Sequence, residues 1–210
     1  MTTGRRGRPQ ASSREQVEAA AIELFLDRGY TRTGIATIAE TCGISKTTFF
    51  RYYPSKSAIV WSAFDDHIGH LERALAEASA EVPTMIAVRS GIVAALRASI
   101  DQGGIWMKRF RILDNTPELR AEESEHWLTW ANVVARFVAG RLGDRPGRLV
   151  PASVGGAVQA AFLAVLREWL DLPEPGVALL PHLDAALTPL CAVLQNWLDD
   201  TAGPEDLPAV

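Results

Sequence analysis

The chain contains 210 residues, of which 48% are hydrophobic. This length and composition are sufficient for a hydrophobic core, and we expect one small module joined to a larger one. No apolar run approaches the roughly 18 residues of a membrane-spanning helix, and Cys42 and Cys191 form no Cys-x-x-Cys unit, so we expect a cytoplasmic protein with no membrane segment, disulfide framework or zinc site. The net charge of −4 is unevenly divided along the chain: residues 1–60 carry nine Lys and Arg against five Asp and Glu, whereas residues 61–210 carry 12 against 20. This asymmetry arises either by chance or because only the N-terminal module meets a polyanion.

The N-terminal region opens with a basic segment and an amphipathic helix. Residues 1–12 are rich in arginine and form either a solubilising tail or an arm that reaches a DNA minor groove. Ser12 with Glu15 three residues later predicts a capping box, and Gly29 is suited to a left-handed C-terminal cap, so we expect a helix over 13–28. The buried stripe of this helix consists of Val17, Ala20, Ala21, Leu24 and Phe25.

Two short helices follow, separated by a break at Gly43. Thr33 is a plausible N-cap for the first, which runs to Cys42, and Ser45 caps the second, over 46–52. Phe49 packs inward in the second helix. Two short helices joined by a turn that contains glycine, and braced by a preceding helix, indicate a helix-turn-helix, although similar hairpins also occur in proteins that do not bind DNA.

The rest of the chain is predicted to be helical, since no alternating strand pattern or hairpin turn occurs. A long helix begins after Ser55 and runs to about residue 80. Five more are expected at 84–101, 105–113, 118–142, 152–171 and 178–199. The predicted fold is therefore all-α with about nine helices. Its parts are a flexible arm over 1–12, a three-helix DNA-binding domain over 13–56, a ligand-binding and dimerisation domain over 57–200, and a flexible tail over 201–210.

The helix after Ser45 has the chemistry to read DNA in the major groove. The ammonium of Lys46 can donate to guanine or phosphate oxygens. The hydroxyls and methyls of Thr47 and Thr48 suit polar base edges or a thymine methyl. Phosphate contacts are expected from Tyr52, Tyr53 and Lys56.

The segments Gly29–Ala39 and Cys42–Lys56 closely resemble the DNA-binding region of the TetR family of regulators. This resemblance implies a three-helix DNA-binding domain, a helical domain for ligand binding and dimerisation, and repression of an operator that a small molecule relieves. The chain departs from the family pattern at Gly34, where a threonine is frequent, at Thr47, where a glycine is frequent, and at Phe50, where a tyrosine is frequent. The expected DNA-binding residues are Thr33, Gly34, Ser45, Lys46, Thr47, Thr48, Arg51, Tyr52, Tyr53 and Lys56.

Aromatic residues in the larger domain line either a ligand pocket or an ordinary core. The pocket candidates are Trp106, Phe110, Trp127, Trp130, Val134 and Phe162. The segments 110–119 and 127–141, together with 49–56, Trp61 and Phe64-Asp65, look similar to regulators of the mycofactocin-system type. That likeness implies that the small apolar effector is similar to a long-chain acyl-CoA. No cofactor is expected.

The helices over 152–171 and 178–199 are the expected dimer interface, because doubling them about a two-fold axis gives a four-helix arrangement. Pro189 lies inside the second of them and should kink it. The residues expected to meet the partner are Val158, Val165, Trp169, Leu187, Leu190 and Leu194.

Three other interpretations of the sequence are considered. His67 and His70 could share a metal, but no third ligand has suitable spacing, so we expect solvated histidines on a helix face. An enzyme would need a site without recognisable chemistry, since none of the Gly-x-Ser-x-Gly, His-Glu-x-x-His or P-loop motifs occurs. A regulator that responds to a protein partner, or to no ligand, remains an alternative.

Overall fold

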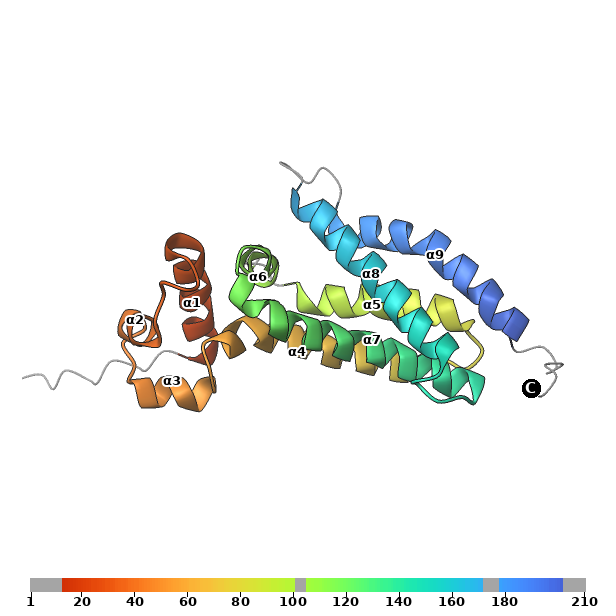
Figure 1. Ribbon diagram of the computed structural model, residues 1–210, viewed down its shortest axis with the longest axis horizontal. Coiled ribbons are helices and arrows are strands. Elements are labelled where there is room, and N and C mark those ends of the chain that lie inside the picture. Colours follow the sequence, from red (N-terminus) through yellow and green to blue (C-terminus); the bar gives the residue numbers. More distant parts are fainter. Residues whose placement is uncertain (1–12, 101–104, 172–177, 202–210) are drawn as a thin grey trace, which may run out of the picture. The chain divides into compact units, whose positions relative to one another are not determined.

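The computed structural model describes residues 13–100, 105–171 and 178–201 (Figure 1). Within these ranges the chain is all-helical, as predicted. The expected arm over 1–12 and nearly all of the expected tail lie outside the described residues. The elements are α1 (Arg14–Arg28), α2 (Ile35–Thr41), α3 (Lys46–Tyr52), α4 (Ser57–Ala76), α5 (Thr84–Ser99), α6 (Ile105–Asp114), the 3₁₀ turn η1 (Pro117–Leu119), α7 (Arg120–Leu142), α8 (Leu149–Asp171) and α9 (Leu179–Thr201).

The capping of α1 differs by one residue from the prediction. Ser13, not Ser12, is the N-cap: its side chain accepts from the backbone N–H of Gln16, while the Gln16 side chain accepts from the backbone of Ser13. Glutamine can take the place of glutamate in a capping box, so Gln16 pairs with Ser13 where the prediction paired Glu15 with Ser12. Gly29 ends the helix with a φ of 87°, a conformation that favours glycine.

Thr33 does not cap α2, contrary to the prediction. Gly34 is the N-cap, and the Thr33 hydroxyl donates inward, 3.2 Å from the carbonyl oxygen of Leu24 and 2.9 Å from that of Gly29. The Thr33 side chain is buried, so it fixes the α1–α2 turn and is turned away from a DNA contact.

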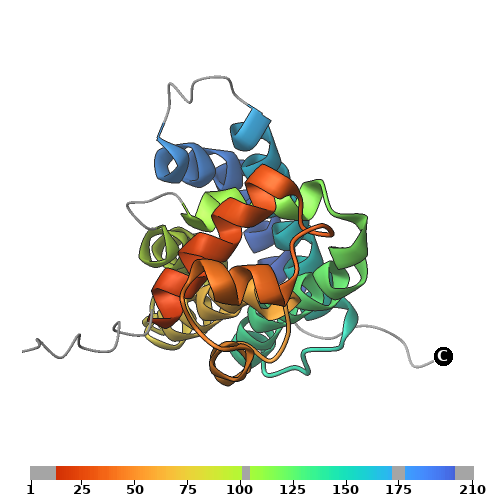
Figure 2. The same cartoon turned by 90° about the vertical axis from the view of Figure 1, so that its left-hand side faces the viewer.

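The described residues fall into two compact units. The N-terminal unit holds residues 13–63 together with 105–120, so α6 and η1 group with α1, α2 and α3. The helices α1 and α6 are in contact, and Figure 2 shows them near each other. This unit differs from the predicted DNA-binding domain, which ends at residue 56 and includes no later segment. Two ion pairs join α6 to α1, one between Arg109 and Glu18 and one between Lys108 and Glu23, whose atoms lie 2.6 Å apart.

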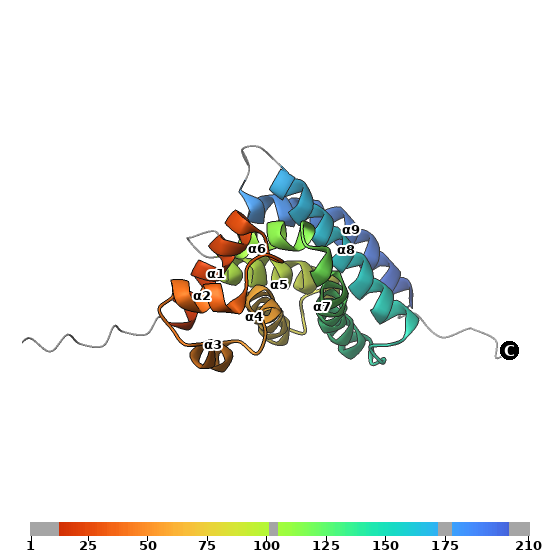
Figure 3. The same cartoon turned by 60° about the vertical axis from the view of Figure 1, so that its left-hand side comes forward.

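The second unit contains the rest of α4 from Phe64, with α5, α7, α8 and α9. The helix α9 packs against both α5 and α8, and Figure 3 shows α8 and α9 side by side. The helices α7 and α8 approach closely at Gly155, where an added Cβ would lie 2.4 Å from the carbonyl oxygen of Ala131. Pro189 lies inside α9, at the predicted place.

The composition of α8 overturns one expectation. Among the described residues it is the one helix long and apolar enough to cross a membrane, with a mean hydropathy of 1.8 over 18 residues, of which 39% are buried. The prediction that no such run exists was wrong, because α8 carries no charged residue between Leu149 and Leu166. A core helix of a soluble protein has the same composition, and Val154, Val158 and Phe162 of α8 are buried.

Candidate nucleic-acid interface and effector region

One face of α3 is open to solvent and carries two cationic side chains, a hydroxyl group and an aromatic ring. Ser45 caps the helix, and Phe49 is fully buried, so it anchors α3 in the N-terminal unit. The residues on the opposite face are exposed, and their helical spacing places them side by side. This exposed face, called the α3 face below, consists of Lys46, Thr47, Phe50 and Arg51.

The stretch of sequence that contains the α3 face carries charge of one sign. No Asp or Glu occurs between Glu40 and Asp65, and the same stretch carries Lys46, Arg51 and Lys56. A surface of this kind attracts a polyanion, because phosphates exchange their counterions for fixed cations. The positive charge of this stretch and the exposure of the α3 face therefore both favour contact with a polyanion.

Two expected contact residues of α3 are only partly available. The backbone N–H of Thr48 donates to Ser45 Oγ at 3.0 Å, and the Thr48 hydroxyl lies 3.0 Å from the same atom. Tyr52 is half-buried, with the guanidinium of Arg51 5.4 Å from the centre of its ring. Both side chains lie at the edge of the α3 face and not on it.

Tyr53 and Lys56 are positioned differently from the prediction. Tyr53 is only 1% exposed, and its hydroxyl lies 3.2 Å from the carbonyl oxygen of Arg14 and 3.1 Å from the Glu18 carboxylate. The expected phosphate contact is therefore wrong for this side chain, which joins α1 to the end of α3. Lys56 Nζ donates to the carbonyl oxygen of Tyr30 at 2.8 Å and lies 3.9 Å from the centre of that ring, so it must leave Tyr30 to reach a phosphate.

The second unit contains an aromatic cluster built around a buried histidine. His67 is completely buried, which corrects the prediction of a solvated residue, and its Nε2 accepts from Trp130 Nε1 at 3.2 Å. Its Nδ1 lies 2.9 Å from Ser99 Oγ, and its ring stacks on Phe162 at 5.7 Å. Burial lowers the pKa of His67 to about 4. One side chain of α4 thereby touches α5, α7 and α8.

Only some of the residues predicted to line a pocket lie close together. Trp127 lies 6.3 Å from Trp130 and 6.1 Å from Phe162, between ring centres, and Phe64 packs edge-on against Trp127 at 4.6 Å. Phe64 and His67 were missed, although their spacing of three on α4 marks one helix face. Val134 is buried in the same unit. The remaining candidates, Trp106 and Phe110, contact each other at 4.7 Å within the N-terminal unit.

Two polar bridges accompany this cluster. His126 Nδ1 lies 2.9 Å from Asp65 Oδ1, which joins α7 to α4, and Arg167 lies 3.5 Å from Glu123, which joins α8 to α7. His126 also meets the ring of Phe64 edge-on. The two bridges therefore tie α4, α7 and α8 together.

The residues predicted to form a dimer interface mostly belong to the core of the subunit. Val158, Val165, Leu187 and Leu194 are buried, and Trp169 and Leu190 are half-buried. The prediction chose apolar side chains at helical spacing, but four of these fill the space between α8, α9 and their neighbours. Several small apolar residues are exposed on the two helices: Ala152, Ala160 and Ala164 of α8 and Ala185, Ala192 and Val193 of α9.

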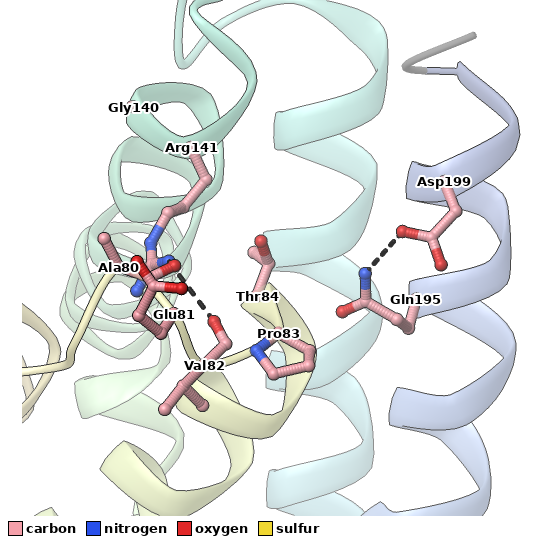
Figure 4. Close-up of a pocket in the computed structure, with 9 residues that line it drawn as sticks. All are labelled: Ala80, Glu81, Val82, Pro83, Thr84, Gly140, Arg141, Gln195 and Asp199. Atoms are coloured by element: carbon pink, nitrogen blue, oxygen red, sulfur yellow. Dashed lines mark hydrogen bonds between the residues drawn. The ribbon is translucent and has the colours of Figure 1, made fainter.

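A hollow of about 590 Å³ lies among the α4–α5 connection, the end of α7 and the end of α9 (Figure 4). The guanidinium of Arg141 donates to four backbone carbonyls there, those of Ala78, Ser79, Ala80 and Val82, at 2.6–3.5 Å. Arg141 is thus engaged in closing the end of α4.

Comparison with protein families gives two matches that together span most of the chain. The family described as "Bacterial regulatory proteins, tetR family" matches residues 19–62, and the "MftR C-terminal domain" matches residues 82–195. The chain is 31% identical to MftR of Mycobacterium tuberculosis, a regulator assigned to mycofactocin biosynthesis, over 86% of this chain and 90% of that protein. It is 28% identical to the transcriptional regulator TcmR of Streptomyces glaucescens, over 87% and 86%.

Solved structures share the fold. SmeT, the repressor of a multidrug efflux pump of Stenotrophomonas maltophilia, aligns with a TM-score of 0.63 at 20% identity, over 87% of this chain and 90% of SmeT. FadR of Thermus thermophilus, solved in complex with lauroyl-CoA, aligns with a TM-score of 0.54 at 20% identity, over 94% of this chain and 99% of FadR.

Proposed function

The chain belongs to the TetR family of bacterial regulatory proteins, and from this premise we propose that it is a homodimeric repressor that α3 holds on operator DNA and that a small apolar effector releases. As a member of this family it is a DNA-binding transcriptional regulator and not an enzyme. The observation that carries the proposal is the α3 face, where two exposed cations flank a hydroxyl and a ring in a stretch without acidic residues. We place the protein in the cytoplasm, where its operator would be.

Dimerisation is supported by the outer sides of α8 and α9. The helix α8 is strongly apolar, yet only 39% of its most apolar stretch is fully buried within the subunit, and Ala152, Ala160 and Ala164 are exposed. A second copy would cover this surface, and small residues would let the backbones of two subunits approach closely. A dimer is also useful to the DNA contact, because two reading helices must lie about 34 Å apart to enter successive major grooves.

The effector is proposed to enter the second unit beside the aromatic cluster. The rings of Phe64, Trp127 and Phe162 offer an apolar lining, and the polar bridges at Asp65 and Glu123 can open. An acyl-CoA is the favoured class, since the related FadR structure contains lauroyl-CoA. Release of DNA then requires that the effector binds the DNA-incompetent conformation more tightly than the DNA-binding one.

Selection of duplexes from a random-sequence pool, followed by effector titration, tests this function. The chain should enrich a sequence with two-fold symmetry and bind it as a dimer. Lauroyl-CoA and longer acyl-CoAs should raise the melting temperature of the protein and weaken its binding to that duplex at fixed salt. A chain that enriches no duplex contradicts the DNA-binding proposal, whereas DNA binding that no acyl-CoA weakens contradicts only the effector.

A further inference from the structure

Phe50 is an exposed aromatic side chain at the centre of the α3 face. It is 51% exposed, and among the described residues of the N-terminal unit it is the most exposed of the large hydrophobic side chains. Its ring meets that of Phe49 at 5.5 Å and 90°, so the buried neighbour fixes the direction in which Phe50 projects. Because burial of apolar surface is favourable, a partner that covers the exposed ring of Phe50 would gain free energy of binding.

The neighbours of Phe50 indicate which partner would cover it. Lys46 precedes it by one helical turn, Thr47 by three residues, and Arg51 follows it directly, so cations flank the ring on the same face. The surrounding stretch lacks acidic residues. This charge pattern suits a polyanion and disfavours an apolar protein surface.

The major groove offers a phenylalanine few partners. Base edges there present hydrogen-bond donors and acceptors together with one apolar group, the C5-methyl of thymine. A tyrosine could donate a hydrogen bond to a phosphate or a base, but the ring of Phe50 cannot. The apolar group is therefore the one feature of the groove that this side chain can recognise.

We propose that Phe50 is a specificity-determining residue that packs against a thymine methyl in each operator half-site, beside the bases that Lys46 and Thr47 contact. This inference rests on the proposed DNA-binding function and adds to it a preference at one base pair. The preference is for the methyl group itself and not for a hydrogen-bonding pattern.

Replacing thymine by uracil removes only the methyl and so tests the inference. A duplex selected by the chain is altered at one thymine position at a time, with uracil placed at the equivalent position of both half-sites. Binding is then measured for the unaltered protein and for Phe50→Ala. At one thymine per half-site, uracil should weaken binding of the unaltered protein about fourfold for each methyl, the value expected for one buried carbon group. The same uracil should leave Phe50→Ala unchanged. Phe50→Leu, which keeps an apolar contact, should retain part of the difference.

Leu26→Ala provides a matched control, because Leu26 is another exposed hydrophobic residue of the N-terminal unit and lies on α1. This variant should respond to uracil as the unaltered protein does. Equal melting temperatures for the variants establish that the substitutions act on DNA contact. If the uracil series is the same for the unaltered protein and Phe50→Ala, the inference is overturned while the DNA-binding function stands. If no duplex is selected at all, both are overturned.

Discussion

The indole N–H of Trp130 donates to Nε2 of His67, and this single contact fixes the state of the buried imidazole. An indole nitrogen only donates, so Nε2 must be an acceptor and His67 must be neutral with its proton on Nδ1. That proton then points to Ser99 Oγ, whose own hydroxyl donates to the carbonyl oxygen of Ala95 at 2.8 Å. The series of hydrogen bonds from Trp130 through His67 and Ser99 to Ala95 is complete only while His67 carries no charge.

Protonation of His67 should therefore destabilise the second unit. Burial lowers the pKa of His67 from 6.5 to about 4, so the unfolded chain binds the proton more readily than the folded one between these values. The stability due to this group is fully present above pH 6.5 and is lost as the pH falls toward 4. The melting temperature should drop over this range, and His67→Gln should reduce the drop while lowering stability at pH 7.5. An equal pH dependence in both proteins would contradict the assignment.

Lys46 and Arg51 should contribute differently to DNA binding. Lys46→Ala should weaken binding of a selected duplex about tenfold and relax its sequence preference, because the variant cannot donate to a base. Arg51→Ala should weaken binding to all duplexes alike and reduce the slope of log affinity against log salt by about one for each phosphate that the guanidinium neutralises. Arg97→Ala removes the same charge from an exposed position of α5 and should change neither quantity. Fluorescence anisotropy at several salt concentrations measures all three.

The two ion pairs between α1 and α6 should differ in their contribution to stability. Arg109 is 5% exposed and burial lowers its pKa to about 10, so it stays charged at neutral pH, and Arg109→Met leaves the Glu18 carboxylate without this partner. We expect a loss of about 3 kcal/mol in the free energy of unfolding. Lys108→Ala breaks the more exposed pair with Glu23 and should lose less than about 1 kcal/mol. Denaturant titration compares the two, and equal losses would contradict the buried geometry.

Gly155 should tolerate no side chain. Gly155→Ala forces a methyl against the backbone of Ala131, which should destabilise the protein by about 1–3 kcal/mol. Gly140→Ala places a methyl in open space on α7 and should instead stabilise it by about 0.5–1 kcal/mol, because alanine favours a helix. Thermal unfolding of both variants would reveal opposite shifts.

A charge on the outer side of α8 should dissociate the dimer. Ala164→Glu should give a folded subunit of about half the native mass in light scattering, since a carboxylate resists burial. Asn132→Glu adds the same charge at an exposed position of α7 and should remain dimeric. A dimer that withstands the first substitution would locate the interface elsewhere.

The helices could be predicted from sequence because their signals are local. Ser45 caps α3 and Gly29 ends α1 as expected, since caps and breaks involve residues within one turn. The family resemblance, carried by Gly29–Lys56, is confirmed by the matching families. Phosphate contacts by Tyr52 and base contacts by Lys46 remain predictions.

The tertiary roles of side chains could not be predicted in the same way. His67 looks like a polar residue on a helix face, and only the approach of Trp130 and Ser99 from other helices makes it a satisfied core residue. Likewise, a large apolar stripe does not reveal whether it faces its own subunit or a partner, and Val158 and Leu187 turned inward. The link between Glu18 and Arg109 spans 91 positions, and no local pattern indicates it.

The grouping of α6 and η1 with the N-terminal helices affects how regulators of this kind can be recombined. A chimera joined once, within α4, would place the α1 of one parent against the α6 of another, and Glu18 and Glu23 would meet foreign side chains. A transplantable reading head must therefore be discontinuous, with residues 105–120 exchanged together with the first 63. Designers of hybrid biosensors from this chain would need to graft both pieces to retain the bonds between them.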